Sequence, residues 1–395
     1  MAVTFNQPPL WRRVLPVFQG YDWWLLLAIG MLVGIGMVTM YSSGFDHGTR
    51  FVMHGRNALI AAGVMFLAAQ VPPQRWMQLA VPLYTVGVIL LLGVEFFGVT
   101  KKGATRWLNI GTEIQPSEIL KIALPLMLAW WFQRREGQLR PLDYGVAAVI
   151  LMVPVALIMK QPDLGTSLLV LAAGLGVLFF AGLSWKLIVP PVLIALTGIV
   201  AIVLSGPEIC KPDVVWPFLH EYQRHRVCTL LDPFSDPLGK GFHIIQGMIA
   251  IGSGGIWGKG FLQGTQTHLE FIPERTTDFV FAAYSEEFGL IGNVTLICCY
   301  LFLIVRGFII AMDAPNLFSR LLAGAVTLIF FTYTFVNIGM VIGILPVVGV
   351  PLPFISYGGT AMVTLGLGLG ILMSISRSRR PVSYTHLRAH ETRED

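Results

Sequence analysis

Ten apolar runs constrain this chain more than any other feature of its sequence. A run of about 18 to 25 apolar residues can cross a bilayer as an α-helix, because a helix satisfies its backbone hydrogen bonds internally. The composition agrees: 55% of the residues are hydrophobic, 12% are charged and the mean hydropathy is +0.70. Soluble domains carry about 25% charged residues. The sequence therefore predicts an all-α polytopic membrane protein with about ten transmembrane helices.

The predicted helices cover Asp22–Tyr41, Asn57–Ala69, Gln78–Phe97, Ile119–Phe132, Tyr144–Met159, Leu164–Gly182, Leu187–Ser205, Phe279–Ala311, Leu321–Leu345 and Thr360–Ile375. The second and fourth runs are short for a full span. We expect these two helices to extend into Met53–Arg56 and Pro116–Glu118.

Lysine and arginine in the short connections predict the orientation, because they accumulate on the cytoplasmic side. They precede the first helix, follow the fourth and tenth, and flank the turn between the eighth and ninth, at Arg12, Arg13, Arg134, Arg135, Arg140, Arg306, Arg320, Arg377, Arg379 and Arg380. This pattern places both termini in the cytoplasm. Lys101, Lys102 and Arg106 then fall on the outer side, where they either attract an anionic ligand or are simply tolerated. The Lys/Arg pattern shows no clustered basic face of the kind that binds nucleic acid.

The longest polar segment, residues 206–277, is expected outside the membrane between the seventh and eighth helices. Within it, the apolar, glycine-interrupted stretch Phe242–Ile256 suits an interfacial or re-entrant helix better than a full span. Cys210 and Cys228 could pair there, since disulfides persist in oxidising compartments. Residues 1–380 are interpreted as one transmembrane domain. Residues 381–395 change character abruptly, and we expect them to be a non-native tail.

Carboxylates at membrane helix ends are the first candidates for function. Asp278 directly precedes the eighth helix, where it either caps that helix or takes part in chemistry. Glu118 and Lys121 stand three residues apart on one helix face, so they either neutralise each other or face a cavity together. Asp163 is either the cap of the sixth helix or part of a site.

Other charged residues of the outer side have equally open roles. Arg224, Arg226 and Lys240 suit a phosphate or pyrophosphate, although basic loop residues also contact lipid headgroups. Glu286 and Glu287 lie inside the eighth predicted helix. We expect these two acids to hold the helix bundle together.

A set of motifs resembles the SEDS family (shape, elongation, division and sporulation proteins). The clearest matches are Asn337–Met340, Leu345–Pro353 and Ser356–Gly359, with further matches at Gln115–Glu118, Gln161–Thr166, Tyr222, Gln223, Arg226, Asp232–Pro233 and Thr277–Phe279. The resemblance extends over nearly the whole chain to about residue 380. Pro273–Arg275 and Gly264–Gln266 resemble the RodA-type elongation branch more than the FtsW-type division branch.

The resemblance implies a peptidoglycan glycosyltransferase that polymerises lipid II at the outer face of the bacterial inner membrane. It implies a catalytic role for Asp278 and a required polar pair in Glu118 and Lys121. The substrate-binding residues that we predict are Tyr222, Gln223, Arg226, Lys240, Asp163 and Ser356. No set of protein metal ligands is predicted. A divalent cation, Mg²⁺ or Mn²⁺, could still bind through substrate phosphates and one or two carboxylates.

The resemblance also implies partners, namely a class B penicillin-binding transpeptidase and the membrane proteins of the elongation complex. Two other functions stay open from the sequence: a lipid II flippase, and a non-catalytic scaffold for the transpeptidase. A division polymerase of the FtsW type is a further alternative within the family.

Overall fold

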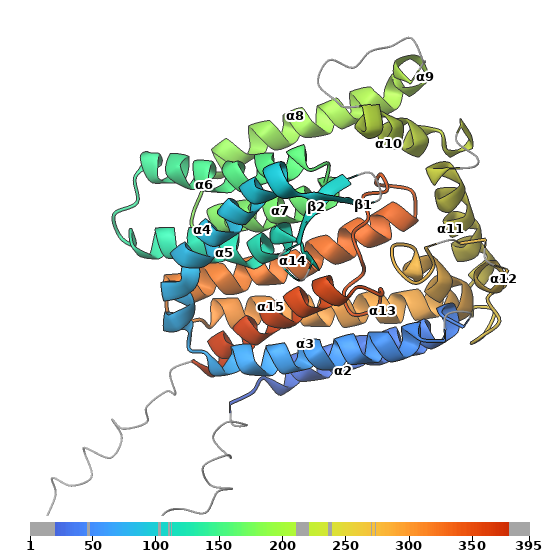
Figure 1. The fold of residues 1–395 in the computed structure, drawn as a ribbon, viewed down its shortest axis with the longest axis horizontal. Coiled ribbons are helices and arrows are strands. Elements are labelled where there is room, and N and C mark those ends of the chain that lie inside the picture. The colour runs from blue at the N-terminus through green and yellow to red at the C-terminus, as the bar shows by residue number, and fades with distance from the viewer. Residues whose placement is uncertain are drawn as a thin grey trace, which may run out of the picture.

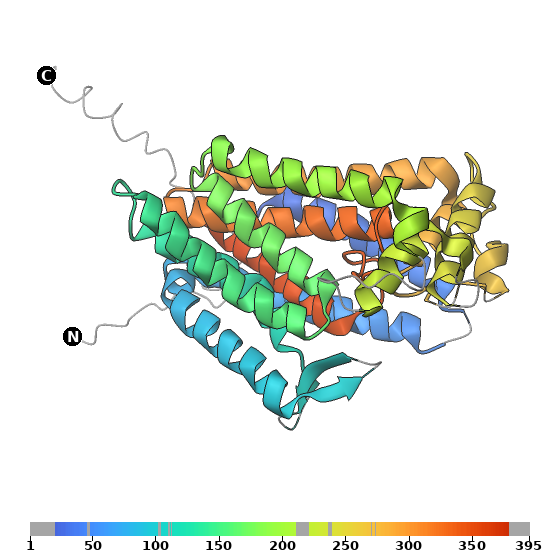
Figure 2. The same ribbon diagram turned by 90° about the horizontal axis from the view of Figure 1, so that it is seen from above.

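The computed structural model describes residues 20–45, 48–101, 104–109, 111, 113–210, 221–235, 239–269, 271–272 and 274–378. Long helices lie side by side and form one bundle, and shorter helices gather at one of its ends (Figures 1 and 2). The elements in chain order are α2 (Trp23–Ser43), α3 (Arg50–Gln70), α4 (Pro73–Phe97), β1 (Val99–Lys101), β2 (Ala104–Asn109), β3 (Glu113–Ile114), α5 (Pro116–Gln133), α6 (Pro141–Lys160), α7 (Leu164–Phe180), α8 (Trp185–Leu204), α9 (Gly206–Ile209), α10 (Glu221–Leu231), η1 (Pro233–Ser235), α11 (Lys240–Gly254), α12 (Thr265–His268), α13 (Val280–Met312), α14 (Leu317–Val341) and α15 (Gly359–Arg377).

A helix covers each of the ten predicted apolar runs, which confirms the all-α membrane fold. As expected, α3 begins ahead of its apolar run at Arg50, and α5 begins at Pro116. Within the described ranges, seven helices are long and apolar enough to cross a membrane, namely α2, α3, α4, α6, α13, α14 and α15. The chain is therefore a multi-pass membrane protein.

The core of the bundle forms around α14, which is buried along most of its length and packs against α5, α7 and α13. On another side, α15 packs along α3. Gly366 and Gly370, one turn apart, permit this approach: a Cβ at either would lie 2.6 Å from the carbonyl oxygen of Ala61 or Met65. Small residues at this spacing are a common means of close helix packing in membranes.

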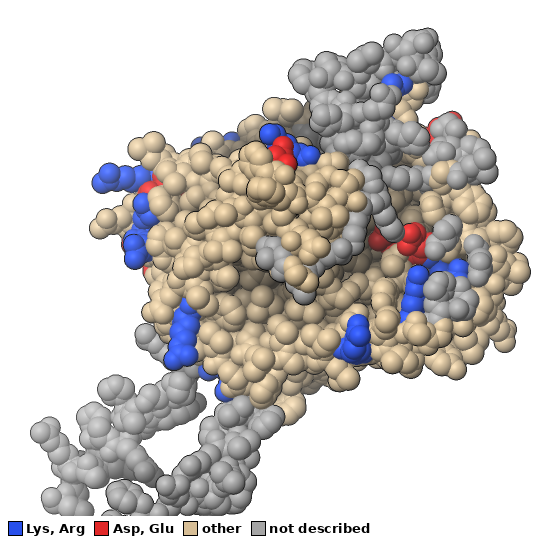
Figure 3. All heavy atoms as spheres, viewed as in Figure 1, with Lys and Arg blue, Asp and Glu red and all other residues tan. Residues whose placement is uncertain are grey.

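The surface is consistent with a lipid environment. Figure 3 shows a broad middle zone with few charged side chains, whereas Lys and Arg gather at the left-hand end, over the turn between α5 and α6. The start of α2 and the end of α15 lie together, because the Arg377 guanidinium stacks over the Tyr21 ring at 5.0 Å.

The connection from α4 to α5 contains three short strands, which the sequence did not predict. They form an antiparallel sheet in the order β1-β2-β3, with Thr100 opposite Thr105 and Leu108 opposite Ile114. The sheet carries Arg106, on β2, to the turn between α6 and α7, where its guanidinium donates to the carbonyl of Pro162 at 2.5 Å.

The eighth predicted helix, α13, is not continuous. Gly289 has a φ of 63° and interrupts it. The segment after α11 packs against the break, where Leu290 N–H donates to Gly255 O at 2.9 Å and Ile291 N–H to Ile256 O at 3.2 Å. Only glycine adopts this backbone conformation without strain, so the sequence permits a break that the tertiary contact requires.

The two acids after the start of α13 fix this region, as predicted. Glu286 is fully buried and accepts hydrogen bonds from Lys259 Nζ at 2.7 Å, from Thr265 Oγ1, and from the backbone N–H groups of Gln266 and Thr267. Glu287 accepts from the Ser42 hydroxyl on α2. Glu286 therefore ties the α11–α12 connection and α12 to α13, and Glu287 ties α13 to α2.

The long polar segment contains α9 to α12. The predicted interfacial helix is α11, which has 15 residues, crosses the end of the bundle in Figure 1 and packs against α13. Cys210 and Cys228, whose pairing the sequence left open, form a disulfide that joins the end of α9 to α10.

Candidate active site

A cavity of about 310 Å³ opens where four helices begin. The starts of α5, α7, α13 and α15 converge there, together with the Pro/Gly-rich loop that follows α14. The lining residues are Arg106, Gln115, Glu118, Lys121, Asp163, Thr166, Leu169, Glu274, Thr277, Asp278, Gly349, Val350, Pro351, Tyr357, Gly358, Thr360 and Ala361. Helix N-termini carry partial positive charge, so this convergence favours an anionic ligand.

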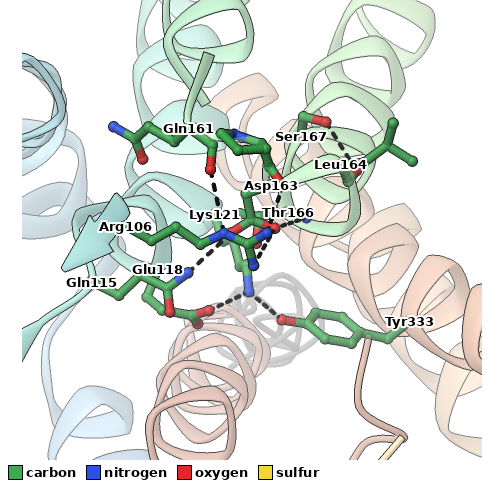
Figure 4. Close-up of polar contacts among 11 residues, drawn as sticks. Arg106, Gln115, Glu118, Lys121, Gln161, Asp163, Leu164, Thr166, Ser167 and Tyr333 are labelled. Atoms are coloured by element: carbon green, nitrogen blue, oxygen red, sulfur yellow. Dashed lines mark hydrogen bonds and ion pairs between the residues drawn. The ribbon is translucent and has the colours of Figure 1, made fainter. Parts of the chain in front are cut away.

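Glu118 and Lys121 meet as the helical spacing predicted. Lys121 is 3% exposed, and its ammonium donates to Glu118 Oε1 and to the Tyr333 hydroxyl, each at 2.6 Å. Figure 4 shows the ammonium between these two groups. The other Glu118 oxygen accepts from Thr364 Oγ1 at 3.2 Å. The two residues neutralise each other and also line the cavity together. Tyr333 on α14 and Thr364 on α15 hold them in place.

Asp163 combines the two roles that the sequence left open. Its carboxylate accepts from the backbone N–H of Thr166 at 3.2 Å and so caps α7. It also accepts from Gln115 Nε2 at 3.1 Å, lies 3.7 Å from Arg106 Nη1 and lines the cavity. In Figure 4 these side chains lie on the opposite side of the Lys121 ammonium from Tyr333. Asp163 thereby links α7, α5 and β2 at the rim.

Asp278 lies at the mouth of α13, two residues before its first helical residue. Three consecutive carbonyl groups ahead of the helix are fixed by other parts of the chain. Thr276 O accepts from the Tyr357 N–H at 2.7 Å, and Thr277 O accepts from Ser356 Oγ at 2.6 Å. Asp278 O accepts from Asn337 Nδ2 at 3.0 Å. These bonds hold the backbone that presents the Asp278 side chain to the cavity.

Ser356 is 3% exposed and is not among the cavity-lining residues. Its hydroxyl donates to Thr277 O and accepts from the Leu352 N–H at 2.7 Å. These contacts position the Asp278 backbone, and a direct contact of Ser356 with substrate stays a prediction. The side chains of Tyr222, Gln223, Arg226 and Lys240 lie outside the described part of the structure, so their predicted roles are also untested.

The cavity has members that were not in the predicted site. Arg106 had a signal, because it is a cation in an outer connection. Glu274 could have been identified because it belongs to the acidic run before α13, and Tyr357 because it belongs to the Pro/Gly-rich motif. Tyr333 and Asn337 contact site residues without lining the cavity. Asn337 begins the Asn337–Met340 motif, and the two are polar residues four apart on one face of an apolar helix, which was the only sign of Tyr333 in the sequence.

The arrangement can support proton transfer and stabilisation of an anion. A carboxylate at Asp278 and an ammonium at Lys121 line the same cavity. Four acidic and two basic side chains line it in all. Within the described ranges, no group of three or more His, Cys, Asp or Glu side chains could form an all-protein metal site.

Comparison with known proteins places this geometry in context. Residues 20–381 match the model of the FtsW/RodA/SpoVE family, described as cell cycle protein. The chain is 50% identical over 363 residues to the peptidoglycan glycosyltransferase MrdB of Escherichia coli, which covers 91% of this chain and 94% of that protein. It is 34% identical over 382 residues to a Geobacter protein named as a probable peptidoglycan glycosyltransferase FtsW, covering 93% and 99%.

Solved structures agree with the sequence relatives. A chain from a peptidoglycan synthase complex, described as coordinating polymerization and crosslinking, has a TM-score of 0.74 at 33% identity and covers 92% of this chain and 99% of its own. The rod shape determining protein RodA of Thermus thermophilus has a TM-score of 0.67 at 28% identity, with coverage of 92% and 99%.

Proposed function

The chain belongs to the FtsW/RodA/SpoVE family of cell cycle proteins, and from this premise we propose that its cavity joins lipid II units into glycan strands during cell-wall elongation. Its activity is that of a peptidoglycan glycosyltransferase, as in the relatives at 50% and 34% identity. The higher identity to MrdB than to FtsW supports the elongation role over the division role.

One observation carries the proposed mechanism: Asp278 and Lys121 line a single cavity at which four helices begin. In the proposed reaction, Asp278 accepts the proton of the acceptor sugar's 4-hydroxyl as that oxygen attacks the anomeric carbon of the donor. The new bond joins this oxygen to the anomeric carbon, and the bond from that carbon to the pyrophosphate oxygen breaks. The electron pair leaves with undecaprenyl pyrophosphate.

The leaving pyrophosphate gains negative charge as that bond breaks, so fixed positive groups lower the barrier. Lys121 supplies a full charge at the cavity. The first turn of α15 adds backbone N–H groups, because its cap residue Gly358 contributes no side-chain bond to them and Gly358, Thr360 and Ala361 line the cavity. Arg226 stays a predicted further cation for the same charge.

A divalent cation, Mg²⁺ or Mn²⁺, is part of the proposal. Glu274 lines the cavity and would be the protein ligand, since Asp278 is assigned to the proton; one or two carboxylates are the usual protein share of a magnesium site that substrate phosphates complete. The excess of acids over bases in the lining also suits a cation. When bound, it would offset the charge of the pyrophosphate.

We propose that the cavity faces the outer side of the membrane and that both termini are cytoplasmic. Arg135 lies in the α5–α6 turn and Arg377 at the end of α15, which is the positive-inside pattern. The disulfide of Cys210 and Cys228 supports an oxidising environment for the α9–α10 region. A class B transpeptidase is the proposed partner, together with the elongation complex, since one structural neighbour is part of a peptidoglycan synthase complex.

The test uses the purified full chain in vesicles with labelled lipid II, with and without the transpeptidase. We expect glycan strands from the wild type and almost none from Asp278→Asn, which keeps the side-chain shape and removes the base. Glu136→Gln, the same type of change on an exposed residue after α5, is the matched control. Movement of lipid II across the bilayer without glycan would indicate a flippase. If the wild type makes no glycan and moves no lipid II but still binds the transpeptidase normally, the protein would be a scaffold.

A further inference from the structure

Two buried polar side chains of α14 face the cavity region without lining it. Tyr333 and Asn337 lie four residues apart, so they share one face of the helix one turn apart. Each has 0% exposure. A polar side chain buried in an apolar span is costly unless it is bonded, so the partners of these two residues identify their role.

The partners are the two groups on which the proposed reaction depends. The Tyr333 hydroxyl accepts from the Lys121 ammonium at 2.6 Å, and its ring centroid lies 5.1 Å from the same ammonium (Figure 4). Asn337 Nδ2 donates to Asp278 O at 3.0 Å and to Val350 O at 2.7 Å. One turn of one helix therefore contacts Lys121 and the backbone of Asp278.

We propose that Tyr333 and Asn337 are positioning residues that fix the separation between Lys121 and Asp278 across the cavity. This inference rests on the proposed function. Both residues belong to the helix that forms the core of the bundle, so α14 gives Lys121 on α5 and Asp278 ahead of α13 a common rigid reference.

The hydrogen bonds to the backbone around Asp278 come from two parts of the structure. Ser356 and Tyr357 fix the carbonyls of Thr277 and Thr276, and both belong to the loop that follows α14. Asn337 alone in this set joins Asp278 to a helix, and through Val350 it also holds the loop. Loss of the Asn337 side chain should leave the turn around Asp278 formed, but the distance between Asp278 and Lys121 should no longer be fixed.

The expected effect follows from the sensitivity of bond-forming steps to geometry. A misplacement of about 1 Å can lower a rate by about 100-fold. Since neither residue lines the cavity, substrate affinity should change little. We therefore expect Tyr333→Phe and Asn337→Ala each to lower kcat by about 10- to 100-fold, with KM for lipid II within about twofold of wild type.

The experiment measures kcat and KM for lipid II polymerisation by the purified full chain with its transpeptidase, and the unfolding midpoint of each variant. Thr332→Val is the matched control, because the Thr332 hydroxyl bonds only to Leu328 O in its own helix turn and Thr332 does not line the cavity. It should keep both parameters.

The outcomes separate the inference from its premise. No glycan from the wild type would refute the proposed function. An active wild type with kcat of both variants within twofold would overturn the positioning role, as would a raised KM at unchanged kcat. If Asn337→Ala fails to fold, Tyr333→Phe decides, because it keeps the ring and removes one oxygen. A normal kcat for a folded Tyr333→Phe would then overturn the inference.

Discussion

Replacement of Lys121 by methionine should destabilise the protein far more than replacement of both Lys121 and Glu118. The two side chains form a 2.6 Å ion pair, and they are only 4% and 14% exposed. Lys121→Met leaves the Glu118 carboxylate buried without its cation. Breaking a buried pair in this way costs about 3 to 5 kcal/mol, because the remaining charge has lost its compensation.

The structure narrows that range. Glu118 keeps the hydrogen bond from Thr364 Oγ1 and some exposure, which favours the lower end, about 3 kcal/mol. The buried Tyr333 hydroxyl loses its donor, which adds about 1 kcal/mol. We expect a loss of about 4 kcal/mol in the free energy of unfolding for Lys121→Met. The double variant with Glu118→Gln should recover more than half of this, because no charge remains buried.

Activity should not follow stability. Both variants lack the cation that stabilises the leaving pyrophosphate, so each should lose about 100- to 1,000-fold in kcat. Denaturant unfolding in mixed micelles gives the stabilities, and glycan synthesis from lipid II gives the rates. Lys160→Met is the control, because the pair of Lys160 with Glu95 is 4.0 Å long and its side chains are 68% and 44% exposed, so neither charge is buried when the other is removed. It should cost about 1 kcal/mol or less and keep activity.

A double variant as unstable as Lys121→Met would refute the argument that Glu118 is the uncompensated charge. A double variant with near-normal polymerisation would refute the role of Lys121 in charge stabilisation.

Three further predictions concern other parts of the molecule. Glu286→Gln weakens the charged hydrogen bond from Lys259, so hydrogen exchange across residues 259–268 should rise, corresponding to a loss of about 2 kcal/mol; unchanged protection there would contradict the role of Glu286 as the anchor. Replacement of Cys210 and Cys228 by serine opens a disulfide with a sequence separation of 18, and should lower local stability by about 3 kcal/mol; equal resistance of wild type and variant to proteolysis between α9 and α10 would count against this. Chelation with EDTA should lower polymerisation and added Mg²⁺ should restore it, whereas full activity in EDTA would remove the cation from the proposal.

Much of the fold follows from local sequence, because a membrane helix can be recognised from its own apolar residues. A bilayer admits only helices or closed barrels, so each apolar run could be assigned to a helix without knowledge of its neighbours. Strands β1 and β3 have only three and two residues, and the six residues of β2, Ala104–Asn109, do not alternate between apolar and polar, so no strand period is visible. The break at Gly289 depends on the backbone of Gly255 and Ile256, more than 30 residues earlier in the chain, and glycine alone does not predict where such a contact forms.

The site was predictable where charge conflicts with an apolar setting. Asp278, Glu118, Lys121 and Asp163 attract notice for that reason, and the structure brings all four to one cavity. Their supports are less visible. The contact of Asn337 with two backbone carbonyls depends on how three separate segments meet, and a single asparagine in a helix does not reveal its partners.

The shape of the cavity favours polymerisation over transport. It is formed at helix starts, and Lys121 lies within the first two turns of α5. Beyond Lys121 the bundle closes: Leu124 and Leu128 on α5 are fully buried, and Phe330 on the facing helix α14 is 1% exposed. A flippase would have to open this packed apolar core to pass a disaccharide and a pyrophosphate, because neither can cross hydrocarbon without polar partners. A polymerase needs only the end where the helices begin, which is where the carboxylate, the ammonium and the helix N-termini already lie together.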